Sequence, residues 1–172
     1  MNAPTRQNRD LSADEFCRAL PPGQRLLGLD LGEKTIGLAL SDVEWRIATP
    51  LKTLGRRKFR EDAVDLFKII DEFGIGGLVL GLPLNMDGSS GPRVQATRTY
   101  ARNIRNLREI PILFWDERLS TVAAERALIS VDMSRKKRAE VIDATAAAFI
   151  LQGVLDRLRD LNHKKASGEP EA

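Results

Sequence analysis

The stretch that decides the fold reads Leu26-Leu27-Gly28-Leu29-Asp30-Leu31-Gly32, an apolar run with one carboxylate near its end. Alternation along a β-strand would put the last three leucines on one face, and Asp30 with the two glycines on the other. A charge within a core strand is costly unless it is paired or bound to a metal ion. We therefore expect Asp30 to belong to a functional site, and the alternative is a carboxylate held by a lysine or a backbone amide.

The residues that follow predict an α/β fold with a five-stranded mixed sheet. Thr35–Ser41 comes after a short turn, which predicts a β-hairpin with the first strand, and a third strand is expected at 47–54. Helices then alternate with buried strands, which predicts crossover connections and helices on both faces of the sheet. The helices are expected at 13–20, 59–73, 93–108, 119–129 and from Ser134 to about Leu161, and the buried strands at 77–82 and 111–115.

The two ends of the chain differ in composition from this core. Residues 1–24 are expected to be an N-terminal appendage, in which Ser12 and Glu15 would cap a short helix. Residues 25–162 are expected to form one domain, since 172 residues fit a single domain. Residues 163–172 are expected to be a flexible tail.

Composition narrows the chemistry that the chain can perform. The single cysteine excludes a disulfide framework and a Cys-based zinc site, and the single histidine leaves little room for a histidine triad. No apolar run could span a bilayer and the first ten residues lack an apolar core, so the cytoplasm is the expected location and no membrane partner is expected. A net charge of +3 and a pI of about 9.2 permit a polyanionic partner.

Two further acids could join Asp30 in a metal site. Asp116 and Glu117 follow a buried strand, at the end of a sheet where ligands gather, although either could simply cap the next helix. Asp143 lies on the small-residue face of the last helix, and its alternative is an ion pair with Arg138 or Lys137. Three such carboxylates can hold Mg²⁺ or Mn²⁺, ions that cleave phosphodiesters in two-metal sites.

Polar and basic segments near these acids could bind a nucleic-acid backbone. The loop after the strand at 77–82 could hold a phosphate, but an ordinary turn also explains its glycines and hydroxyls. The basic patch at 135–138 adjoins Asp143 and could follow a phosphate backbone. An arginine stripe at 98, 102, 105 and 108 is expected to be a solvated helix face, and its alternative is a surface for a nucleic-acid backbone. Trp45 and Trp115 are expected to be packing residues, and base stacking is the alternative.

Four motifs together resemble the YqgF/RuvX family of pre-16S rRNA nucleases, which are related to Holliday junction resolvases. The resemblance runs from about Leu26 to about Arg157 and rests on Leu29–Gly32 with Ile36–Asp42, Gly81–Ser89, Asp116–Thr121 and Asp143–Ala147. It implies an RNase H-like fold. It also implies a metal-dependent endonuclease that processes the 5′ end of pre-16S rRNA during ribosome biogenesis in the bacterial cytoplasm.

The resemblance assigns roles to individual residues. Asp30, Glu117 and Asp143 would be the catalytic carboxylates and the ligands of Mg²⁺ or Mn²⁺. This family often carries a basic residue where Thr35 stands, so Lys34 is expected to do more of the substrate binding here. The other expected substrate-binding residues are Asn85, Asp87, Gly88, Ser89, Arg118, Arg135, Lys136, Lys137 and Arg138.

Three kinds of function stay open on the sequence. Structured RNA is the favoured substrate. A Holliday junction resolvase would use the same site on branched DNA and would favour a homodimer, because a junction has two symmetric cuts, whereas an RNA nuclease could be a monomer. A non-catalytic nucleic-acid-binding regulatory module is the third reading, and retention of all three acids argues against it.

Overall fold

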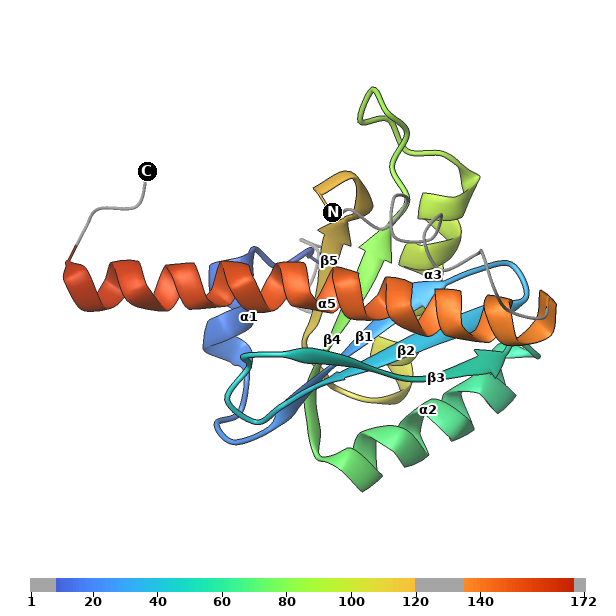
Figure 1. Cartoon of the computed structure of the whole chain (residues 1–172), viewed down its shortest axis with the longest axis horizontal. Coiled ribbons are helices and arrows are strands. Elements are labelled where there is room, and N and C mark those ends of the chain that lie inside the picture. Colours follow the sequence, from blue (N-terminus) through green and yellow to red (C-terminus); the bar gives the residue numbers. More distant parts are fainter. Residues whose placement is uncertain (1–8, 120–134, 169–172) are drawn as a thin grey trace, which may run out of the picture.

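The computed structural model describes residues 9–119 and 135–168, and its centre is a five-stranded mixed sheet in the order β3-β2-β1-β4-β5 (Figure 1). β2 pairs antiparallel with β1 and with β3, whereas β4 runs parallel to β1 and to β5. The hairpin and the crossovers are as the sequence predicts. The strands are β1 Arg25–Leu31, β2 Thr35–Ser41, β3 Ala48–Gly55, β4 Ile75–Leu82 and β5 Ile112–Asp116.

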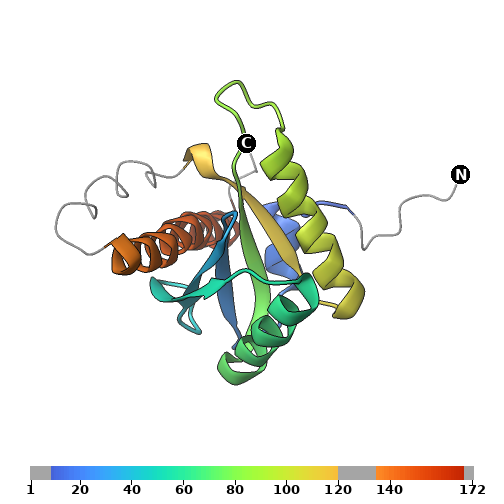
Figure 2. The ribbon, with the colours of Figure 1, turned by 90° about the vertical axis from the view of Figure 1, so that its right-hand side faces the viewer.

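Helices cover both faces of the sheet and give three layers (Figure 2). They are α1 Ala13–Ala19, α2 Phe59–Phe73, α3 Pro92–Leu107 and α5 Arg135–Ser167, with a short 3₁₀ turn η2 at Glu117–Leu119. The predicted helix at 119–129 lies outside the described residues, except for its first residue in η2. None of the helices that the structure describes is both long and apolar enough to cross a membrane.

Alternation along each strand divides the core into two layers. On one face, large aliphatic side chains of β1, β2 and β4 pack against α2 and α3, among them Leu27, Leu29 and Leu80. On the other face, α5 and α1 pack against Leu26, Ala39, Val79 and Leu113. α5 supplies a run of buried alanines, at 144 and 146–148, and these let it lie close to the sheet.

The chain ends pack against the core more than the sequence predicts. The predicted helix capped by Ser12 and Glu15 is present as α1, and its Phe16 is fully buried beneath α5, where a Cβ atom added to Gly77 of β4 would lie 2.9 Å from its ring. α5 continues to Ser167, past the predicted end near Leu161. Its last turns stay helical because Leu161 is buried and Lys165 forms an ion pair with Asp14 of α1.

Candidate active site

Asp30 lies at the centre of a row of three positions that crosses three strands. Its side chain is buried, with 5% exposed, and Gly37 of β2 is its partner in the antiparallel register. On the other side, the parallel register pairs Leu29 with Leu80, so Gly81 of β4 comes next along the strand, beside Asp30. Glycines on both sides allow neighbouring segments to approach the sheet closely beside this carboxylate.

Asp143 of α5 covers one end of this row. A Cβ atom added to Gly37 would lie 2.0 Å from the Asp143 carbonyl oxygen, so only glycine allows α5 to approach so closely. The Asp143 carboxylate is half-buried and accepts a hydrogen bond from the Thr35 hydroxyl, with 2.6 Å between Oγ1 and Oδ2. Thr35, which departs from the basic residue frequent in the family, therefore orients one of the three acids.

Glu117 covers the other end of the row. It begins η2 directly after β5, and a Cβ atom added to Gly81 would lie 2.7 Å from its Oε1 atom. Its carboxylate thus lies over the end of β4, on the same face of the sheet as Asp30. Whether Glu117 also caps a following helix lies outside the described residues.

The three acids therefore come from β1, η2 and α5 and lie above one face of the sheet, along the row Gly37–Asp30–Gly81. Carboxylate oxygens are the ligands that Mg²⁺ and Mn²⁺ prefer, so the donor chemistry fits such an ion. Within residues 9–119 and 135–168, however, no three acidic, histidine or cysteine side chains stand in a ready-made metal-binding group. A complete ligand set would require these carboxylates to turn toward one another.

Asp116, the neighbour of Glu117, forms an ion pair with Arg118. Both of its oxygens accept from Arg118, with Nε at 3.0 Å from each and Nη2 at 2.7 Å from Oδ2. This hydrogen bonding lowers the pKa of Asp116 and raises the pKa of Arg118. Arg118 also donates to the carbonyl oxygen of Met86 at 3.4 Å, so the pair ties the end of β5 to the loop at 83–91.

The loop at 83–91 projects beyond the sheet beside η2 (Figure 1) and is held by its own side chains. Asn85 Nδ2 donates to Ser89 Oγ at 3.0 Å, and the Ser89 hydroxyl donates to Asp87 Oδ1 at 2.6 Å. The hydrogen bonds from Ser89 lower the pKa of Asp87. Gly88 takes a left-handed conformation, φ +84°, and a Cβ atom added there would lie 3.4 Å from Arg118 Nη1. These contacts shape the loop, and its predicted binding of phosphate stays a prediction.

The predicted basic contacts are only partly within the described residues. Lys34 is exposed in the turn between β1 and β2, next to Thr35, and Lys137 is exposed in the first turn of α5. The structure does not describe the side chains of the other three residues of the patch, Arg135, Lys136 and Arg138.

The arginine stripe on α3 makes contacts within the protein. Arg98 pairs with Asp10 and lies over the Phe114 ring, and Arg108 pairs with Asp71. These contacts favour a structural role for the stripe over a surface for nucleic acid.

Arg56 was not predicted from the sequence as a residue of the site, but it forms a hydrogen bond at the end of β1. Its Nη1 atom donates to the Gly32 carbonyl oxygen at 2.8 Å, and its guanidinium lies over the Tyr100 ring at 5.8 Å. Burial raises the pKa of Tyr100, and the nearby Asp62 carboxylate raises it further. The sequence offered one indication of this role, the position of Arg56 directly after β3. Because β3 pairs with β2, Arg56 lies beside the turn that carries Lys34, and its backbone amide donates to the Lys34 carbonyl oxygen.

Known proteins resemble this chain in both sequence and fold. A protein of Ruegeria pomeroyi named "Putative pre-16S rRNA nuclease" is 60% identical over 150 residues, which cover 87% of this chain and 97% of that protein. A protein of Methylocella silvestris with the same name is 64% identical over 138 residues, covering 80% of this chain and 86% of that protein. The resemblance drawn from the four motifs is thereby confirmed.

Among solved structures, the yeast mitochondrial Holliday junction resolvase Ydc2 matches with a TM-score of 0.52 at 13% identity, covering 94% of this chain and 93% of that one. RuvC of T. thermophilus in complex with a Holliday junction substrate matches with a TM-score of 0.50 at 11% identity, covering 78% and 96%. These likenesses confirm the predicted RNase H-like fold. Residues 24–157 match the family RuvX, described as Holliday junction resolvase, and the chain therefore belongs to the RuvX family.

Proposed function

We propose that the protein is a metal-dependent endonuclease that cleaves pre-16S rRNA near its 5′ end during ribosome biogenesis in the cytoplasm. The observation that carries the proposal is the row Gly37–Asp30–Gly81, with Asp143 above one end and Glu117 above the other. The glycines at both ends of the row let α5 and the Glu117 side chain approach the sheet beside Asp30, which brings the three acids to one face. The names of the relatives support RNA as the substrate.

Asp30, Glu117 and Asp143 would hold Mg²⁺ or Mn²⁺, which when bound supplies an activated water for phosphodiester hydrolysis. The chain's own contribution is to place the carboxylates. The β1 backbone fixes Asp30, Thr35 orients Asp143, and the turn after β5 presents Glu117. Burial of Asp30 also limits the access of bulk water to this part of the site.

The substrate backbone would be held at the rim of the site. Arg118 links the loop at 83–91 to the turn that carries Glu117, so the loop and the acid would move as one unit. Lys34 and the patch at 135–138 would neutralise phosphates on the side of Asp143. Asn85, Asp87 and Ser89 bond to one another, so their part would be to fix the loop that presents Gly88 and Arg118.

Resolution of branched DNA is the second candidate. The family description and the fold shared with Ydc2 and RuvC favour it. Such an enzyme would act as a homodimer, because a four-way junction presents two symmetric cleavage sites. A monomer in sedimentation measurements would favour the RNA nuclease.

The decisive experiment compares two substrates under the same conditions. The purified full chain is incubated with a precursor 16S rRNA fragment and with a synthetic four-way DNA junction, in Mg²⁺, in Mn²⁺ and in EDTA. We expect metal-dependent cleavage of the RNA at one position, no cleavage in EDTA, and none by Asp30→Asn. Cleavage of the junction alone would replace rRNA by DNA as the substrate. Salt-sensitive binding without cleavage of either substrate would make the protein a binding module.

A further inference from the structure

A pocket of about 510 Å³ lies at the far end of α5 from the three acids. It opens between the turn that joins β2 to β3 and the last turns of α5, and its volume is typical of small-molecule sites. Arg159 in its wall lies 16 residues beyond Asp143 on the same helix, which is about 24 Å along the axis. The pocket is therefore separate from the row of carboxylates.

One wall of the pocket is the indole of Trp45, held in an unusual backbone conformation. Trp45 has φ +56°, and it is the only non-glycine residue with a positive φ in the described part of the chain. The Asp42 carboxylate fixes the turn by accepting from the backbone amides of Arg46 and Ile47 at 2.7 and 3.0 Å. Strain of this kind persists where the surroundings impose it, which marks candidate functional positions.

The ring of Trp45 is also fixed. Its Nε1 atom donates to the Gln24 carbonyl oxygen at 2.7 Å, so the polar edge is satisfied and points away from the pocket. The side chain is half-buried, packs partly on the core, and lines the pocket with the rest of its surface. An aromatic surface held rigidly at the edge of an open pocket is suited to stacking.

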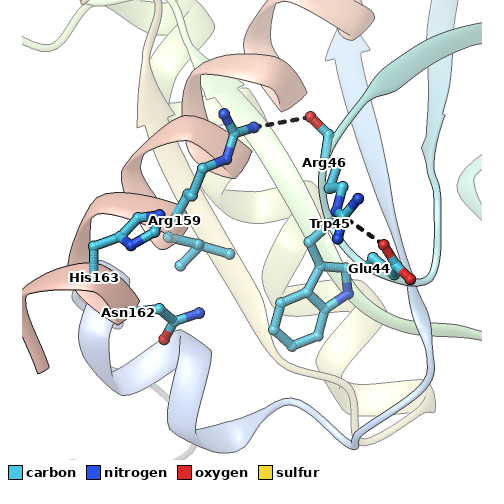
Figure 3. Close-up of a pocket in the computed structure, with 7 residues that line it drawn as sticks. Glu44, Trp45, Arg46, Arg159, Asn162 and His163 are labelled. Atoms are coloured by element: carbon cyan, nitrogen blue, oxygen red, sulfur yellow. Dashed lines mark hydrogen bonds and ion pairs between the residues drawn. The ribbon is translucent and has the colours of Figure 1, made fainter. Parts of the chain in front are cut away.

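The opposite wall is polar. Figure 3 shows Asn162 and His163 across the pocket from the Trp45 ring, with Arg159 at one end. Arg159 Nη2 donates to the Arg46 carbonyl oxygen at 3.0 Å, which fastens α5 to the turn. Two arginines line the pocket, and each pairs with an acid, Arg46 with Glu44 at 2.8 Å and Arg159 with Asp156 at 3.4 Å. Each guanidinium carries five N–H donors, so both can also donate to a ligand.

We propose that this pocket binds a nucleotide, with the base stacked on Trp45 and the phosphate against the guanidinium groups of Arg159 and Arg46. Each part of the ligand meets matching chemistry, because bases stack on indoles, guanidinium groups bind phosphates and the Asn162 amide can bond to a base edge. The nucleotide is either part of a bound strand or a free mononucleotide. The inference extends beyond the proposed function and requires none of the three acids.

The distance to the acids agrees with a nucleotide that belongs to a bound strand. A span of about 24 Å corresponds to about seven base steps at 3.4 Å each. A strand that runs along α5 could therefore reach Asp143 and the pocket at once. A free mononucleotide would instead occupy the pocket without any contact to the acids.

The test uses the fluorescence of Trp45 in the full chain with Trp115→Phe, which removes the other tryptophan. Adenosine monophosphate and a single-stranded RNA of eight nucleotides are each titrated in EDTA, so that no cleavage intervenes. We expect at least one of them to quench the fluorescence with saturation. Stronger binding of the RNA would assign the pocket to a strand, and stronger binding of the mononucleotide would assign it to a free ligand.

Two matched variants decide whether the binding is in the pocket. Arg159→Ala removes a pocket cation, whereas Arg157→Ala removes an equal charge two residues away, on a residue that does not line the pocket. We expect Arg159→Ala to weaken binding about 10-fold, as for the loss of a charge-assisted hydrogen bond, and Arg157→Ala to leave it within twofold. If Arg159→Ala misfolds, His163→Ala provides the second pocket variant. Absence of quenching by both ligands, or equal weakening by Arg157→Ala, would overturn the proposal.

Discussion

The two faces of the sheet consist of side chains from the same strands, but one forms a hydrophobic core and the other carries the three acids. Toward α2 and α3, alternate positions carry large aliphatic side chains such as Leu29, and these are buried in one hydrophobic cluster. Toward α5, the intervening positions carry Gly37, Asp30 and Gly81. One face is therefore packed with large side chains, and on the other the glycines let α5 and Glu117 approach closely where the carboxylates lie. Substitutions that add or remove atoms on each face should separate these two roles.

The largest effect is expected from adding a methyl group at Gly37, where α5 lies against the sheet. In Gly37→Ala the new methyl group would lie 2.0 Å from the Asp143 carbonyl oxygen, a backbone atom that cannot turn aside. α5 must shift, and we expect the unfolding free energy in urea to fall by about 3 kcal/mol or more, with loss of cleavage. Gly55→Ala on the neighbouring β3 is the control, because a Cβ atom there meets nothing within 4 Å. Equal stability of the two variants would contradict the close approach of α5.

Gly81→Ala should affect activity more than stability. Its methyl group would meet the ends of two flexible side chains, Glu117 Oε1 and Ile150 Cδ1, each at 2.7 Å. These can move, so we expect a loss of about 1 kcal/mol in unfolding free energy but a fall of about 10- to 100-fold in kcat as Glu117 is displaced. The double variant with Glu117→Gln should cleave no more slowly than Glu117→Gln alone. Fully multiplicative losses would show that Gly81 acts independently of Glu117.

Thr35→Val should produce a smaller and more specific effect. Valine keeps the shape of threonine but cannot donate to the Asp143 carboxylate. Hydrogen bonds to charged groups contribute about 1.5–3 kcal/mol, so kcat should fall about 10-fold or somewhat more with little change in KM. Thr35→Ser retains the hydroxyl and should recover most of the rate. If the serine variant is as slow as the valine variant, the hydrogen bond is not what positions Asp143.

The smallest effect concerns the pair of Asp116 and Arg118 at the edge of the face that carries the three acids. Because Arg118 lowers the pKa of Asp116 in the folded state, the pair stabilises the fold above the unfolded pKa of about 3.9 and loses this effect as pH falls through the lower folded pKa. Asp116→Asn should therefore cost about 1 kcal/mol or less from pH 5 to 8, and nothing near pH 2. Glu72→Gln on α2 gives the baseline for loss of one exposed acid. A cost that persists at pH 2 would argue against the ion pair as its cause.

The strands and their two faces could be predicted, because neighbouring side chains of a strand point to opposite faces and the sequence shows which residues share a face. Asp30 stood out for that reason, since one carboxylate interrupts a row of leucines. Contacts between distant segments could not be predicted in the same way. The hydrogen bond from Thr35 to Asp143 joins residues 108 positions apart, and the Arg56 contact depends on how β3 returns along β2.

The ends of the chain show the same limitation. Residues after Leu161 read as a polar tail, but an ion pair between Lys165 and Asp14 of α1 accompanies the helical turns there. Phe16 looked like part of an appendage because nothing near it in the sequence shows that it enters the core beneath α5. Local patterns predicted the elements, whereas the packing of the two terminal helices depends on partners far away in the chain.

The most direct test of the division between the faces compares two adjacent residues of β1. Asp30→Asn and Leu29→Ala are measured together for cleavage rate per folded molecule and for unfolding free energy in EDTA. Asp30→Asn should lose cleavage by about 10³-fold or more and should keep its fold, because asparagine has the shape of aspartate and can still form hydrogen bonds. Leu29→Ala should lose about 2–5 kcal/mol of stability and keep its rate per folded molecule. An active Asp30→Asn protein, or a folded Leu29→Ala protein as inactive as Asp30→Asn, would contradict the separation of the two faces.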